Sequence, residues 1–141
     1  MFKSLLLIVC ASLLSLVLLG IGAWIHLQFT PLGGAIKEYG DQWYEHGDPF
    51  EVMRRSLLVM QFIMAPAICV FVGLSVGVIS RKSAWQIAAL GLLPFAVFMS
   101  LASSWSTQGM LLSLAYLILS ALSAYAVASL RARAAGGMST R

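Results

Sequence analysis

Long apolar runs dominate the pattern of hydrophobic and polar positions along this chain. A helix needs roughly 20 apolar residues to cross a hydrocarbon core about 30 Å thick. Four runs without a charged residue reach this length, and they cover residues 4–27, 56–80, 84–103 and 109–130. The pattern therefore predicts an all-α integral membrane protein with four transmembrane helices.

The segments between these runs predict how the helices are arranged. Short polar turns at residues 81–83 and 104–108 join the last three runs, so these helices should be antiparallel neighbours in a bundle. A long loop, residues 28–55, joins the first run to the second. We therefore expect one four-helix domain over residues 1–133, followed by a flexible cytoplasmic tail over residues 134–141.

An alternative for the first run is a cleaved signal peptide, because Lys3 precedes it. The run is longer than the apolar region of about 7–15 residues in signal peptides, and no convincing small-residue cleavage site precedes the loop. We therefore expect this run to remain as a transmembrane helix.

The composition agrees with a protein that is mostly embedded in lipid. Hydrophobic residues make up 60% of the chain and charged residues 10%, with a mean hydropathy of +0.91. Ordinary soluble domains are about half apolar and about a quarter charged. The net charge of +4 comes from Lys and Arg residues at the segment edges, without a basic stripe, so no nucleic-acid partner is expected.

The Lys and Arg residues predict the orientation, since cytoplasmic loops carry an excess of them. With both termini in the cytoplasm, six of the nine lie inside: Lys3, Arg81, Lys82, Arg131, Arg133 and Arg141. The other three, Lys37, Arg54 and Arg55, lie outside. This arrangement is expected for a multi-pass protein of a plasma membrane such as the bacterial inner membrane.

The outer loop contains every acidic residue of the chain, and two of them form a helix-start pattern. Asp48 is suited to the N-cap, Pro49 to the first helical position and Glu51 to the third, as in a capping box. The second membrane helix should therefore begin near Pro49, outside the membrane.

Residues 35–46 of the loop have the pattern of a short interfacial helix. Ile36, Tyr39 and Trp43 would share one face at a spacing of three and four residues, and the opposite face would carry the remaining acids: Glu38, Asp41 and Glu45. The segment 30–34 should form the turn before it.

The simplest interpretation of these acids is a solvated face; as the alternative, Glu38, Asp41, Trp43 and Glu45 are the candidate partner-binding face. Three carboxylates together with His46 are also a conceivable site for a divalent ion. Their spacing matches no dedicated metal motif, so we expect no metal, cofactor or catalytic residue in this loop.

Inside the predicted spans, chemistry-bearing residues are scarce. No Asp, Glu, Lys or Arg lies there, which disfavours a proton relay or an ion path. His26 lies at the outer end of the first span. Cys10 and Cys69 lie in apolar runs and form no CxxC pair, which disfavours redox chemistry.

The second span carries two features that favour helix contacts. Gln61 is the candidate intramembrane polar contact, through an interhelical hydrogen bond of its side chain. Small residues at every fourth position form a candidate packing face: Ala65, Cys69, Gly73 and Gly77. Pro66 and Pro94 should each kink their helix.

These observations favour a non-enzymatic membrane protein that acts through protein contact, as an accessory or assembly subunit or as an immunity-like protector. Its expected partners are the lipid bilayer and another membrane protein or a further copy of itself. The alternative is a small homo-oligomeric carrier or pore for a neutral or weakly polar substrate.

Overall fold

The computed structural model describes residues 2–80, 83–102 and 106–137, and this part of the chain contains helices and no strand. Four helices are long and apolar enough to cross a membrane: Phe2–Phe29, Pro49–Ile79, Ala84–Leu101 and Thr107–Ala135. The predicted all-α class, with four helices long and apolar enough to cross a membrane, is therefore confirmed. Arg81, Lys82 and Arg141, on which the predicted orientation partly depends, lie outside the described residues.

The chain begins with α1 (Phe2–Phe29), which is followed by a small outer region of α2 (Pro31–Tyr39) and the 3-10 helix η1 (Gly40–Glu45). A second long helix comprises α3 (Pro49–Val59), the π-helical segment η2 (Met60–Met64) and α4 (Ala65–Ile79).

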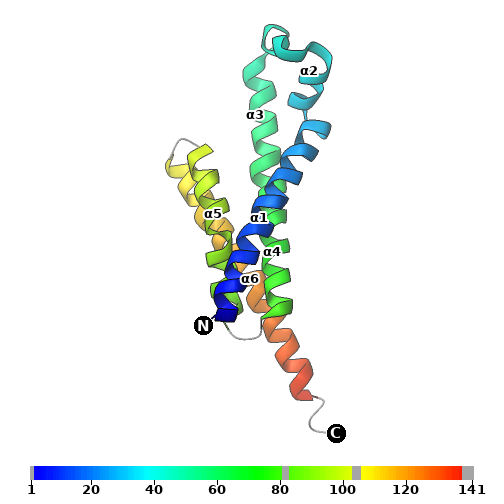
Figure 1. Cartoon of the computed structure of the whole chain (residues 1–141). Coiled ribbons are helices and arrows are strands. Elements are labelled where there is room, and N and C mark those ends of the chain that lie inside the picture. The colour runs from blue at the N-terminus through cyan, green and yellow to red at the C-terminus, as the bar shows by residue number, and fades with distance from the viewer. Residues whose placement is uncertain (1, 81–82, 103–105, 138–141) are drawn as a thin grey trace.

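The last two helices are α5 (Ala84–Ala102) and α6 (Thr107–Gly137). Residues 134–137 of the predicted tail thus continue α6, while residues 138–141 lie outside the described part. Both ends of the described chain lie at the same end of the molecule (Figure 1).

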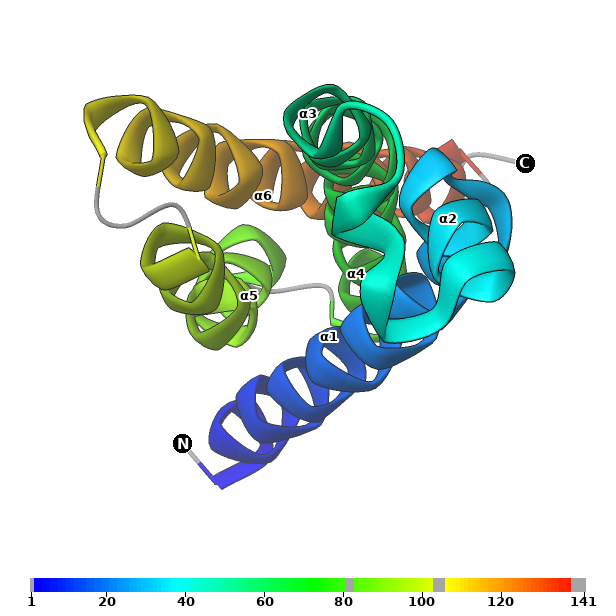
Figure 2. The same cartoon turned by 90° about the horizontal axis from the view of Figure 1, so that it is seen from above.

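Two central helices hold the bundle together. α4 and α5 pack on each other, and each also packs on α1 and on α6. Viewed from above, α1 and α6 lie on opposite sides of this central pair (Figure 2). Large side chains that are fully buried at the centre include Phe95, Leu92 and Val72. The close approach of α1 to α5 depends on Gly91, where a Cβ atom would lie 2.4 Å from the Cβ of Ala11.

The outer region is joined to α1 through a tight turn at Thr30. The Thr30 hydroxyl donates to the His26 carbonyl oxygen at 2.7 Å and accepts from the Gly33 amide at 3.5 Å, so it caps α2. A Cβ atom at Gly33 would lie 1.7 Å from the Leu27 carbonyl oxygen, so only glycine fits here. The Ser56 hydroxyl then accepts from the Leu32 amide at 3.2 Å and ties α3 to α2.

The loop helix differs from the one predicted over residues 35–46. It begins earlier, because Thr30 is an N-cap and Pro31 occupies the first helical position, where its missing N–H costs nothing. It ends at Tyr39, because Gly40 adopts a φ of 58° that a right-handed helix does not allow. The prediction of a turn over residues 30–34 and of one continuous helix to residue 46 is wrong.

Pro66 is accommodated by a change of helix type. The π segment η2 ends immediately before Ala65, whose amide donates to the Met60 carbonyl oxygen five residues back. This wider turn lies beside the carbonyl groups that the proline ring would otherwise contact. Pro94, in contrast, lies within α5, which continues as one helix from Ala84 to Ala102.

Candidate partner-binding surfaces and intramembrane polar contact

The acids at the start of α3 stabilise the helix itself. An Asp48 carboxylate oxygen accepts from the amides of Phe50 at 3.0 Å and Glu51 at 3.3 Å, which confirms the predicted N-cap. The Glu51 carboxylate pairs with the Arg55 guanidinium at 2.5 Å. Two of the five acidic groups thus have a local structural role.

Glu38 also has a local partner. The Tyr39 hydroxyl is hydrogen-bonded to the Glu38 carboxylate, and this bond, with the negative charge of Glu38 and slight desolvation, raises the pKa of Tyr39 above its usual value. The Tyr39 ring stacks on the His46 imidazole, with centroids 4.3 Å apart. His46 Nδ1 lies 3.2 Å from the Gln42 carbonyl oxygen. These contacts fold the end of α2 against the residues that follow η1.

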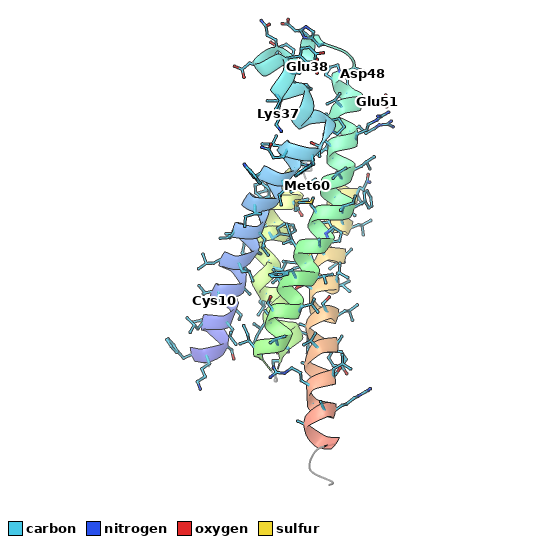
Figure 3. All side chains as sticks on the ribbon, turned by 90° about the vertical axis from the view of Figure 1, so that its right-hand side faces the viewer. Cys10, Lys37, Glu38, Asp48, Glu51 and Met60 are labelled. Atoms are coloured by element: carbon cyan, nitrogen blue, oxygen red, sulfur yellow. The ribbon has the colours of Figure 1, made fainter. Side chains whose placement is uncertain are left out.

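The remaining members of the predicted partner-binding face lie in η1. Asp41 and Glu45 are exposed, whereas Trp43 is half-buried and makes an edge contact with Tyr44. Because the helix breaks at Gly40, these residues do not continue the α2 face that carries Glu38. Figure 3 places Glu38, Asp48 and Glu51 together at the end of the molecule opposite to Cys10.

A shared divalent-ion site is not formed by these acids. In residues 2–80, 83–102 and 106–137, no three His, Cys, Asp or Glu side chains come together in a group that could hold a metal ion. Glu38, Asp41 and Glu45 instead lie exposed on α2 and η1.

The small-residue face of α4 lies inside the bundle, against α6. Ala65, Cys69, Gly73 and Gly77 are all buried. A Cβ atom at Gly73 would lie 2.4 Å from the Ser120 carbonyl oxygen, and one at Gly77 would lie 2.7 Å from the Ala124 carbonyl oxygen. The contacts of Gly73 and Gly77 therefore place this packing face against α6.

Gln61 makes its interhelical contact through the backbone. The Tyr116 hydroxyl of α6 donates to the Gln61 carbonyl oxygen at 2.7 Å. The Gln61 carbonyl oxygen lacks its usual donor within the helix. The amide of Ala65, four residues later, donates to Met60 instead, and Pro66, five residues later, has no N–H. A carbonyl without a partner is costly in hydrocarbon. The Gln61 side-chain amide has no hydrogen bond within residues 2–80, 83–102 and 106–137, so the predicted contact through this amide stays a prediction.

A small polar cluster surrounds this contact. The Ser100 hydroxyl of α5 donates to the Ser113 hydroxyl of α6 at 2.8 Å, and both side chains are buried. Tyr116, one turn from Ser113, also packs edge-on against Phe95. These two hydrogen bonds hold η2 and α5 to α6.

Sequence reasoning missed a shallow groove along α3. Its lining residues follow one helical face at spacings of three and four: Phe50, Met53, Arg54, Leu57, Leu58 and Gln61. We call this surface the α3 groove. Gln61 also lines a small pocket with Ser113 and Tyr116 of α6, so the groove reaches the polar cluster. The regular spacing of these residues was the signal that could have revealed it.

Comparison of the chain with known protein families, with curated protein sequences and with solved structures gave no match.

Proposed function

We propose that this protein acts by direct contact with another membrane protein, as an accessory or assembly subunit or as a protector. In this proposal both termini are cytoplasmic and the region from α2 to α3 lies on the outer side. The contact surface is the outer part of the molecule, where α2, η1 and α3 project beyond the ends of α5 and α6 (Figure 1).

Helix lengths support this placement. The 19 residues of α5 span about 28 Å, close to the thickness of one hydrocarbon core. The continuous helix Pro49–Ile79 has 31 residues, which span about 46 Å. If α4 crosses the core beside α5, most of α3 extends past it toward water.

The observation that carries the proposal is the apolar surface of this projecting part. Phe50 is 85% exposed, and Met53 and Leu57 are also exposed. On the spans, such side chains contact lipid. Outside the hydrocarbon, a partner that covers these side chains stabilises the complex by about 25 cal/mol for each Å² of apolar surface removed from water. An unoccupied surface of this kind is typical of a protein interaction site.

The polar groups favour contact over transport. A carrier for a weakly polar substrate needs side chains that can bind it, and Tyr116, Ser100 and Ser113 are hydrogen-bonded within the protein. The pocket between them is small. Flux of a neutral solute into vesicles containing the purified protein would favour the carrier instead.

Purification in a gentle detergent, at native expression level and after brief crosslinking, tests the proposal. We expect a second membrane protein in a fixed ratio, and we expect Phe50→Ser to reduce its recovery. Phe2→Ser is the matched control, because Phe2 is 79% exposed at the opposite end of the molecule. Recovery of only a monomer or a homodimer would contradict the proposal.

A further inference from the structure

We propose that the α3 groove binds one transmembrane helix of the partner, and that this helix carries a carboxylate near its outer end and a hydrogen-bonding side chain about two turns deeper. This inference rests on the proposed function and defines the chemistry of the partner.

The groove is positioned to receive a helix from the side. Its face of α3 is the one opposite Ser56, which is buried and bonded to α2. Figure 1 shows α3 diverging from the outer ends of α5 and α6, and the groove ends where Gln61 meets Ser113 and Tyr116. From Phe50 to Gln61 the groove follows three turns of helix, about 16 Å, which suits the side of a second helix.

Charge defines the outer end of the groove. Arg54 and Arg55 are adjacent and both exposed, but they have different surroundings. Arg55 is paired with Glu51, whereas Arg54 lines the groove and has no ion pair within the described ranges. An arginine at the membrane surface attracts a carboxylate strongly, because the bonds are charge-assisted and the local dielectric is low.

A second polar group lies seven residues deeper. The Gln61 amide lines the same groove without a hydrogen-bond partner in the part of the chain that the structure describes. Seven residues correspond to two turns and a rise of about 10 Å. A partner side chain such as Asn, Gln or Ser at that depth would satisfy the amide.

The two anchors together distinguish a helix from a lipid. A phospholipid could place its phosphate at Arg54, but its acyl chain has no hydrogen-bonding group two turns deeper, beside Gln61. A transmembrane helix can present both groups, at positions seven residues apart on one face, with apolar residues between them against Leu57 and Leu58.

A synthetic helix tests the groove without knowledge of the natural partner. The probe is a fluorescent leucine- and alanine-rich single-span peptide with Glu at its outer end and Asn seven residues deeper. Energy transfer measures its association with the labelled protein in zwitterionic phospholipid vesicles. We expect Arg54→Gln to weaken association about tenfold and Gln61→Leu to weaken it a few-fold.

Matched variants distinguish binding in the α3 groove from the general loss of a positive charge or of an exposed amide. Arg55→Gln removes the same charge one residue away, and Gln86→Leu removes an exposed amide from α5, so both should leave association unchanged. A peptide with Lys in place of Glu should associate with Arg54→Glu better than with the wild-type protein.

Two results with the synthetic helix and the purified protein would each overturn the inference. One is equal association of a control peptide that has Leu at both polar positions. The other is that Arg54→Gln changes only the retention of an anionic phospholipid, seen by native mass spectrometry, because the occupant is then a lipid. A natural partner that remains bound to Arg54→Gln and Gln61→Leu would also contradict binding in the α3 groove, while leaving the proposed function intact.

Discussion

The Tyr116 hydroxyl supplies a hydrogen bond that the second long helix cannot supply to itself. Tyr116→Phe leaves the Gln61 carbonyl without this donor, and we expect it to lower the free energy of unfolding by about 1 kcal/mol. Unfolding in mixed detergent micelles, followed by circular dichroism, measures the change. Tyr125→Phe is the control, because Tyr125 is 61% exposed.

Pro66 determines how much unfolding free energy is lost in Tyr116→Phe. Pro66→Ala restores an N–H five residues after Gln61, so the carbonyl gains a donor within its own helix. We expect Tyr116→Phe to cost clearly less in the Pro66→Ala protein than in the wild type. A double-mutant cycle that shows additive effects would contradict the link between Pro66, Gln61 and Tyr116.

Tyr39 should show a pH-dependent interaction with Glu38. Its pKa is raised in the folded protein above the model-compound value of 10.0 by the hydrogen bond to Glu38 and by the charge of that residue. Stabilisation by this contact is therefore complete below pH 10 and is lost as the pH rises through the folded-state pKa. Glu38→Gln should move the pKa of Tyr39 back toward 10.0.

The measurement is the phenolate absorbance difference between each protein and its Tyr39→Phe counterpart. Glu45→Gln serves as the control, because Glu45 lies in η1 whereas the pKa shift of Tyr39 comes from Glu38. An unchanged titration of Tyr39 in Glu38→Gln would show that the two side chains do not interact.

At the scale of elements, α4 and α6 are held close by glycine. Gly73→Ala places a methyl group against the Ser120 backbone, and we expect a loss of about 1–3 kcal/mol in unfolding free energy through overpacking. Gly20→Ala should cause no loss, since no atom lies within 4 Å of a Cβ at Gly20. Equal stability of the two variants would contradict the close packing of α4 on α6.

Local signals predicted some elements and missed others. Asp48, Pro49 and Glu51 located the start of α3, because capping depends on residues only a few positions apart. The same chemistry at Thr30 and Pro31 starts α2, but the two glycines that follow also fit a turn, so the pattern predicts a start that is too late. The π segment was missed because a proline predicts a disturbed helix without specifying whether a kink or a wider turn accommodates it.

For the whole molecule, the orientation can be tested with single cysteines in a chain that lacks Cys10 and Cys69. We expect a cysteine at Asp41 to react with a membrane-impermeant maleimide on intact cells. A cysteine at Ala134 should react only after the membrane is opened, because both termini are proposed to be cytoplasmic. The opposite labelling pattern would reverse the proposed orientation.

The sequence by itself determined that four helices are long and apolar enough to cross a membrane and that α3 starts at Pro49. Both depend on local quantities, namely the length of an apolar run and the chemistry of a helix end. Only the tertiary structure decided that Gly73 faces α6, that the Tyr116 hydroxyl donates to the Gln61 carbonyl oxygen and that Gln61 lies beside Ser113 and Tyr116 of α6. These contacts depend on the depth and rotation of helices that are far apart in the chain, which hydropathy and spacing do not specify.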